Sequence, residues 1–451
     1  MIITWLMLLL LGIVSFGLKN EAWFIYHGIT ISWLIITITS LVFVIYIVTK
    51  YAKDIVVATI MLGGYFMRIA MLFIDRHFYN HLGFILLHRG GGDTEAFYSR
   101  GWHLYHGNIA PERAGSYGRL IANIFEFFGP SRIIVQYANL LFGVTAVFLG
   151  YAILRKFTEN RTALIIFLST AMFVPHFASV NVIMLREAII AMFIAMSLYF
   201  FADWFKKGNP VNLVLSLAAI IIASTYHSAS IAPALGYALC VIFYDRKSNS
   251  FRFKADTVLW VLIVGITVFT IDWLFGEAVF GRFSGIETLE DVMDAGPSPM
   301  GAAAYSVSIE TGVVFLDFLI NTPIRMIYLI MSPMPWYWRG PMDVVAFALS
   351  SMFFGFAYFK VIQTLRKPDG QDTAFITFLL LTSLTSVFLF GWGVSNAGTA
   401  MRHRDKFFIQ HMLMLAACYA KDAPGLLGML PKGLISDKNM KKILSLMRGK
   451  N

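Results

Sequence analysis

The stretch "NVIMLREAIIAMFIAMSLYFF", Asn181 to Phe201, contains one charged pair, Arg186 and Glu187, followed by fourteen residues without a formal charge. The apolar run covers residues 187–204, and a helix of that length extends for about 27 Å at about 1.5 Å per residue. The hydrocarbon core of a bilayer is about 30 Å thick. The stretch therefore predicts a membrane-spanning helix that begins with two charges.

Comparable apolar runs recur along the chain of 451 residues. They indicate about twelve transmembrane helices. The runs cover residues 2–17, 30–49, 54–75, 132–154, 162–180, 187–204, 211–225, 228–244, 256–275, 342–363, 372–392 and 404–420. Only 14% of the residues are charged, against about 25% in soluble domains, and the mean hydropathy is +0.69. Because no run alternates as barrel strands do, the sequence predicts an all-α, polytopic membrane protein.

The formal charge of +10 is spread over short loops and a basic tail. This distribution favours anchoring against anionic membrane lipid over binding of nucleic acid. The basic loop residues are Lys50, Lys53, Arg155, Lys156, Arg161, Lys206, Lys207, Arg246, Lys247, Arg252, Lys254, Arg366 and Lys367. With both chain ends in the cytoplasm, all of them lie on the cytoplasmic side if the run 311–331 does not make a single crossing.

The run 311–331 contains polar residues that are costly when they face lipid. They are Asp317, Asn321, Pro323 and Arg325. We therefore expect a re-entrant segment, or a pair of half-helices that line a cavity.

The apolar runs leave no room for a separate soluble domain, so we expect residues 1–420 to form one membrane domain. Residues 85–131 form an extracytoplasmic loop with the candidate catalytic residues, and residues 276–340 form a second extracytoplasmic loop with the re-entrant segment. Residues 421–451 form a basic cytoplasmic tail. The first run lacks a basic n-region and a small-residue cleavage site, so we expect it to remain as a helix.

The stretch "GGGDTEAFYSRGWHLYHG", Gly90 to Gly107, lies on the opposite side of the membrane from the basic loops. Its mixture of apolar and polar residues is typical of a helix in the membrane interface. Asp93 then lies at the outer boundary of the membrane, close to Glu95. The competing interpretation is that Asp93 caps a helix and Glu95 complements the helix dipole.

Arg186 and Glu187 lie on the same outer side. Adjacent helical residues point about 100° apart, so each needs its own partner. Either the two residues join neighbouring helices, or Arg186 faces an anionic ligand. His227, in "YHSASIAP" at a helix turn, is either a structural residue or a phosphate contact.

The stretch "MRHRDKFF", Met401 to Phe408, places Arg402, His403 and Arg404 at the start of the last apolar run. Arginine is suited to two-pronged contacts with phosphate oxygens. The alternative is a positively charged collar that binds lipid headgroups. Such a collar would lie on the side where the positive-inside rule disfavours basic residues.

These stretches, taken in order, resemble segments of bacterial membrane glycosyltransferases of the GT-C superfamily and of surface-polysaccharide polymerases. The resemblance covers roughly residues 85 to 420 and is carried by "GDTEAFYSRGWHLYHG", "SYGRLIANIFEFFGPSRIIVQYANLLFGVTAVFLGYAIL", "LREAIIAMFIAMSLYF", "MSPMPWYWRG" and "MRHRDKFFIQHMLMLAA". The last of these is similar to an Arg-Tyr-Arg motif before the final helix. His403 stands where a tyrosine is usual.

The resemblance implies a GT-C-like fold and transfer of a sugar from a polyprenyl-phosphate or polyprenyl-diphosphate carrier to a glycan acceptor. The enzyme would lie in the bacterial cytoplasmic membrane with its active side outward, and would act as a polymerase or as a single-sugar transferase. Asp93, with Glu95 in reserve, would be the general base. The substrate contacts would be Arg186, Glu187, His227, Arg402, His403, Arg404 and Trp336, the last on an aromatic surface in "PMPWYW".

Two alternatives follow from the same residues. A flippase for lipid-linked oligosaccharide would be expected to consist of two related halves, and the sequence contains no internal repeat. A divalent metal between Asp93 and Glu187 is a further alternative, but two acids are few ligands for a hard cation, so we expect no cofactor. Cys240 and Cys418 lie in apolar runs without neighbouring ligands, so we expect neither a disulfide nor a zinc site.

Overall fold

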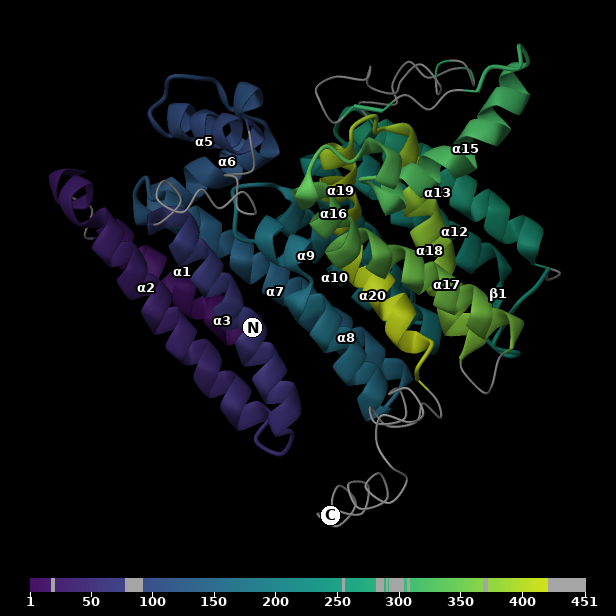
Figure 1. The fold of residues 1–451 in the computed structure, drawn as a ribbon, viewed down its shortest axis with the longest axis horizontal. Helices are drawn as coiled ribbons and strands as arrows, with labels where there is room; N and C mark the ends of the chain where they lie inside the picture. The colour runs from purple at the N-terminus through teal and green to yellow at the C-terminus, as the bar shows by residue number, and fades with distance from the viewer. Residues whose placement is uncertain are drawn as a thin grey trace.

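The computed structural model describes residues 1–17, 21–77, 92–253, 256–280, 288, 291, 304–305, 309–367 and 372–420. The described chain is mainly helical, with one short hairpin of β1 (Tyr244–Asp245) and β2 (Ser250–Phe251) (Figure 1). The helices are α1 (Ile2–Gly17), α2 (Glu21–Lys50), α3 (Ile55–His77), α5 (Gly92–Tyr105), α6 (Pro111–Phe128), α7 (Arg132–Phe157), α8 (Arg161–Phe173), α9 (Pro175–Val180), α10 (Glu187–Lys207), α11 (Pro210–Tyr226), η2 (Ser228–Ile231), α12 (Ala232–Phe243), α13 (Thr257–Phe280), α15 (Val314–Met331), η3 (Pro335–Tyr337), α16 (Pro341–Ala346), η4 (Phe347–Ser351), α17 (Met352–Arg366), α18 (Thr373–Trp392), α19 (Ala397–Asp405) and α20 (Phe408–Ala417).

Seven helical stretches among the described residues are long and apolar enough to cross a membrane. They are Thr30–Lys50, Ile55–His77, Arg132–Phe157, Glu187–Lys207, Val314–Met331, Asp343–Arg366 and Thr373–Trp392, and shorter apolar helices accompany them. Large apolar side chains are exposed along α2 and α13, as expected for surfaces that contact lipid. The prediction of an all-α, multi-pass membrane protein is confirmed. The count of about twelve crossings and the GT-C-like topology stay predictions.

The centre of the bundle is formed by α7 and α10, which are mostly buried. Aromatic rings fill the space around α10: Phe201 stacks on Tyr237 with ring centroids 4.1 Å apart, and Phe205 stacks on Tyr244 at 3.9 Å. Phe201 also lies 5.2 Å from the ring of Phe378, so the packing fixes α10, whose first residue is Glu187, relative to α12 and α18.

Two of the predicted apolar runs are interrupted in the structure. The run 162–180 divides into α8 and α9 at Val174, because Pro175 has no N–H to continue the helix. The last run begins earlier than predicted, with the Asn396 side chain accepting hydrogen bonds from the N–H groups of Gly398 (2.9 Å) and Thr399 (3.3 Å) at the start of α19. Arg402, His403 and Arg404 therefore lie in the last turn of α19 rather than at the start of a long helix.

The run 311–331 forms a single helix, α15, that continues through Pro323. The alternative of two half-helices is therefore wrong. Packing on α18 holds the helix on both sides of Pro323, which lacks an N–H donor. The Phe318 ring stacks on Trp392 with centroids 5.3 Å apart, and the Arg325 guanidinium lies 4.5 Å from the centroid of the same indole.

The C-terminal end of α15 contacts one segment of the chain, the residues that follow α18. Tyr305 precedes the helix in sequence but packs on Tyr328 near its C-terminal end, with ring centroids 5.0 Å apart, and the Tyr305 N–H donates to the Ser395 carbonyl at 2.9 Å. After the helix, the Ser332 carbonyl accepts a hydrogen bond from Arg404 at 2.6 Å. The length and composition of α15 would allow a crossing, and the expectation of a re-entrant segment that does not cross stays a prediction.

The described part of the loop 85–131 folds into α5 and α6, which lie against each other at the upper end of the bundle in Figure 1. Their backbones approach closely at Gly101, where an added Cβ would come within 2.4 Å of Ile121. The Ser116 hydroxyl donates to the Thr225 carbonyl at 2.7 Å and ties α6 to the end of α11. This helix pair carries Asp93 and Glu95.

Candidate functional site

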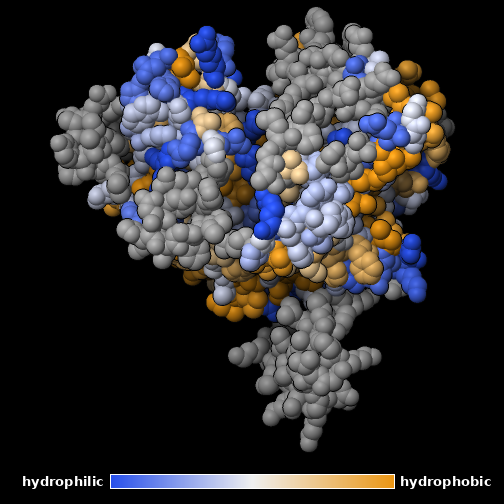
Figure 2. Space-filling model, turned by 45° about the horizontal axis from the view of Figure 1, so that its top comes forward, coloured by the Kyte–Doolittle hydropathy of each residue, from blue (hydrophilic) through white to orange (hydrophobic). Residues whose placement is uncertain are grey.

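Four segments that are distant in sequence bring most of the predicted residues together at one end of the bundle. The segments are the first turn of α5, the beginning of α10, the turn between α11 and η2, and the end of α19. We call this cluster the four-segment site and define it as Asp93, Arg186, Glu187, His227, Arg402, His403 and Lys406. Figure 2 turns this end forward and shows hydrophilic residues over the α5–α6 lobe and beside the hollow next to it.

Asp93 forms an ion pair with Arg402, although 309 positions separate the two residues. Arg402 Nη1 lies 2.6 Å from Asp93 Oδ2, and the Asp93 side chain is 56% exposed. Ion pairs in such exposed positions contribute about 0–1 kcal/mol to stability. Asp93 can therefore exchange Arg402 for another partner at small cost.

Glu95 points to a different partner. Arg132 Nη1 and Nη2 donate to its two carboxylate oxygens at 2.9 and 2.6 Å. The same guanidinium lies 4.0 Å from the centroid of the Tyr98 ring. Glu95 thus fastens α5 to the start of α7, while Asp93 faces α19.

Arg186 and Glu187 diverge, as their adjacent positions predict. Arg186 Nη1 donates to the Tyr226 carbonyl at 2.9 Å, and its guanidinium lies 5.6 Å from the centroid of the Phe97 ring. Glu187 is buried, and its Oε1 lies 3.9 Å from Nζ of Lys406, which is also buried. Within the described residues, Glu187 Oε2 makes no hydrogen bond.

His227 and His403 lie next to each other, with ring centroids 4.9 Å apart. Burial is the main reason that the pKa of His403 falls well below its usual value, and the positive charges of Lys406, Arg402 and Arg186, together with His227, lower it further. His403 is therefore neutral at neutral pH. It is a polar, uncharged ring among cations.

Arg404 lies apart from this cluster. It is fully buried, and its Nη1 donates to the carbonyls of Ile330 (2.7 Å) and Ser332 (2.6 Å), while Nη2 donates to Ser350 Oγ (2.9 Å). These contacts fix the end of α15 against α19 and η4. In this arrangement Arg404 is a structural anchor, and Arg402 is the arginine of α19 that faces Asp93.

Trp336 lies on an aromatic surface beside the end of α15. Its side chain is 66% exposed, and Nε1 donates to the Tyr328 hydroxyl at 3.0 Å. Tyr305 and Tyr337 extend the same surface, with their rings 5.0 and 6.2 Å from Tyr328. Trp336 makes no contact with Asp93 among the contacts of the described residues.

Buried amides of α7 position the beginning of α10, a feature that our sequence analysis did not single out. Gln136 Nε2 donates to the Val182 carbonyl at 2.9 Å, and Asn139 Nδ2 donates to the carbonyls of Ile183 (2.6 Å) and Leu185 (2.9 Å). These bonds hold the segment that ends at Arg186. The available signal was the presence of two amides inside an apolar run, where polar groups are costly unless they serve a role.

Gly143 of α7 creates the space for the same segment. A Cβ at this position would lie 2.3 Å from Asn181 Cγ and 2.4 Å from its Nδ2. The start of the segment 181–186 is therefore in direct contact with the α7 backbone.

Asp405 is another residue near the site that our sequence analysis did not single out. Its Oδ2 lies 2.6 Å from His176 Nδ1.

The two acids considered for a divalent metal each face a cation instead, Asp93 facing Arg402 and Glu187 facing Lys406. The described residues contain no group of three or more His, Cys, Asp or Glu side chains that could hold a metal ion. The arrangement resembles an anion-binding site with one exposed carboxylate at its edge.

No protein-family model, curated protein or solved structure matches this chain.

Proposed function

We propose that the protein is a glycosyltransferase that takes a sugar from a polyprenyl-phosphate or polyprenyl-diphosphate carrier and transfers it to a glycan acceptor. In this proposal it resides in the bacterial cytoplasmic membrane, with the four-segment site on the extracytoplasmic face, and builds a cell-surface polysaccharide. One observation carries the proposal: the exposed carboxylate of Asp93 lies at the edge of a site whose cations, Arg186, Arg402 and Lys406, come from the beginning of α10 and the end of α19.

The transfer reaction needs both a carboxylate and cations. An acceptor hydroxyl attacks C1 of the sugar, its proton passes to a carboxylate base, and the bond between C1 and the phosphate oxygen breaks. The departing phosphate gains negative charge, which fixed cations stabilise. Asp93 is our candidate base, and Arg402, Arg186 and Lys406 supply the positive charge.

The ion pair between Asp93 and Arg402 supports a substrate-dependent exchange. When donor phosphate binds, the Arg402 guanidinium turns to the phosphate oxygens, which it can contact with two parallel hydrogen bonds. Asp93 is then released to accept the hydroxyl proton. The exposed position of the pair makes this exchange inexpensive.

The aromatic surface of Trp336, Tyr328 and Tyr337 supports binding of a sugar or prenyl chain. An exposed indole offers a broad apolar face and one N–H donor. Here the N–H is already directed to Tyr328, so the ring face is the part of Trp336 that we assign to the ligand.

Deletion of the gene, followed by mass spectrometry of the accumulated lipid-linked glycans, tests the proposal against a flippase. Loss of a transferase should leave an unextended lipid-linked donor that is accessible from outside intact cells to a membrane-impermeant oxidant such as periodate. Loss of a flippase should leave the donor protected from the oxidant until the membrane is opened. Protected donor would reject the transferase proposal.

A further inference from the structure

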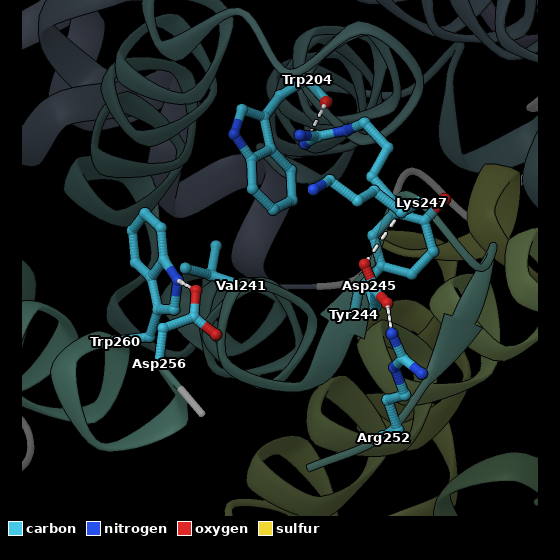
Figure 3. A pocket seen from close by; sticks show the side chains of 9 residues that line it. Trp204, Val241, Tyr244, Asp245, Lys247, Arg252, Asp256 and Trp260 are labelled. Atoms are coloured by element: carbon cyan, nitrogen blue, oxygen red, sulfur yellow. Dashed lines mark hydrogen bonds and ion pairs between the residues drawn. The ribbon is translucent and has the colours of Figure 1, made fainter. Parts of the chain in front are cut away.

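A pocket lies near the end of α10 opposite the four-segment site (Figure 3). It has a volume of about 420 Å³, within the range of small-ligand sites. Its lining includes Trp204, Asp245, Lys247, Arg252, Asp256 and Trp260. Trp204 lies seventeen residues after Glu187 on the same helix, so about 26 Å separates the two positions at about 1.5 Å per residue. That distance is close to the thickness of a hydrocarbon core.

The pocket combines three cations with two carboxylates, which leaves one net positive charge. Asp245 is already engaged: it accepts from the Lys247 N–H (3.1 Å) and Ser248 Oγ (2.9 Å), and it pairs with Arg252. Asp256 accepts from Trp260 Nε1 at 2.8 Å. None of these bonds uses the Lys247 ammonium group, and Arg252 pairs with Asp245 through Nη2, so the Lys247 side chain and the rest of the Arg252 guanidinium can receive a ligand.

Lys247 and Arg252 are the cations best placed for that role. The Lys247 side chain extends toward the indole of Trp204, across the open side of the pocket from Asp256 and Trp260 (Figure 3). The Arg252 side chain is 58% exposed, so part of its guanidinium faces outward. Arg246 differs, because its guanidinium donates to the carbonyls of Trp204 (3.0 Å) and Phe205 (3.2 Å) at the end of α10.

An exposed apolar surface leads away from the pocket. α13 begins directly after Asp256, and its exposed side chains include Val258, Leu262 and Ile266, spaced four residues apart on one face. The indoles of Trp204 and Trp260 stand where this surface meets the charged groups. Tryptophan is enriched at the same boundary between headgroups and hydrocarbon in membrane proteins.

We propose that this pocket binds the phosphate headgroup of an anionic phospholipid, whose acyl chains lie along the exposed face of α13. Lys247 and Arg252 bind the phosphate, and the two indoles flank the headgroup. This site is independent of the transfer chemistry at the other end of α10.

The test is a native mass spectrometry titration of the full-length protein in detergent with phosphatidylglycerol. Lys247→Gln should weaken binding of the first lipid about tenfold, since a charge-assisted hydrogen bond is lost. The matched control is Lys207→Gln, which removes an exposed cation at the same end of α10 but outside the pocket, and it should bind like the parent protein.

Two further measurements test whether the bound phosphate belongs to an anionic lipid or to a soluble molecule. Phosphatidylethanolamine, which has no net charge, should bind more weakly than phosphatidylglycerol, and soluble glycerol phosphate should not displace the bound lipid at millimolar concentration. Equal weakening by the Lys247 and Lys207 substitutions would overturn the proposal. Equal binding of the two lipids, or complete displacement by glycerol phosphate, would also overturn it.

Discussion

Asp93→Asn separates the catalytic role of Asp93 from its structural roles. The substitution keeps the size of the side chain, and because Asp93 is the second residue of α5 rather than its cap, the helix loses only the favourable interaction of a negative charge with its N-terminus. It removes the charge that pairs with Arg402 and the capacity to accept a proton at neutral pH. Because the pair is exposed, we expect a loss of at most about 1 kcal/mol of stability.

The expected effect on the transfer rate is much larger. Loss of a positioned general base lowers rates by roughly 10²- to 10⁴-fold, which corresponds to about 3–5 kcal/mol of transition-state stabilisation. The assay is the initial rate of sugar transfer by purified protein, with the lipid-linked donor that accumulates in the deletion strain. Thermal unfolding of the same sample measures the structural cost.

Glu95→Gln is the matched control, because Glu95 lies in the same turn but pairs with Arg132 rather than with α19. It should lower the midpoint of thermal unfolding slightly and leave most of the rate. Near-parent activity of Asp93→Asn would refute the assignment, and Glu187 would be the next candidate.

Three other predictions concern the packing and orientation of the site. Arg404→Lys should lower thermal stability by about 2 kcal/mol, because lysine cannot replace all three hydrogen bonds to buried acceptors; an unchanged unfolding midpoint with lost activity would instead indicate a direct substrate contact. Lys406→Met should cost about 3–5 kcal/mol by leaving Glu187 buried without a counter-charge, and adding Glu187→Gln should recover most of it in thermal unfolding; no recovery would show that the two groups are not coupled. A cysteine at the exposed His103 should react with an impermeant thiol reagent in intact cells, whereas a cysteine at Lys207 should react only after the membrane is opened; the reverse pattern would invert the proposed topology.

Most helix positions followed from the sequence because a membrane helix must be long and continuously apolar. The boundaries near α7, α10 and α18 lie within a few residues of the predicted runs. The break at Val174 was also readable, since Pro175 cannot continue a helical hydrogen-bond pattern. The sequence did not predict that α15 is unbroken, because this depends on packing against Trp392, more than sixty residues away in sequence.

The sequence predicted most residues of the site, but not which of them form ion pairs with each other. The sequence placed Asp93 and Arg402 on one side of the membrane, whereas their contact depends on how the α5–α6 pair sits over α19. The different roles of Arg402 and Arg404 could have been anticipated. Residues two apart on a helix point about 200° apart, so the two guanidinium groups cannot readily face one ligand.

The contact between Gly143 and Asn181 has a consequence for genetic screens. A methyl group at position 143 would displace Asn181, and with it the backbone that ends at Arg186. Because a shift of about 1 Å in a positioned group can cost about 10²-fold in rate, Gly143→Ala should be recovered as an inactive allele whose product still accumulates in the membrane. A substitution in the middle of a buried helix would then have the phenotype of an active-site lesion. Second-site suppressors that shorten the side chain at position 181 should restore growth. Their absence from a saturated screen would show that Gly143 does not position the site.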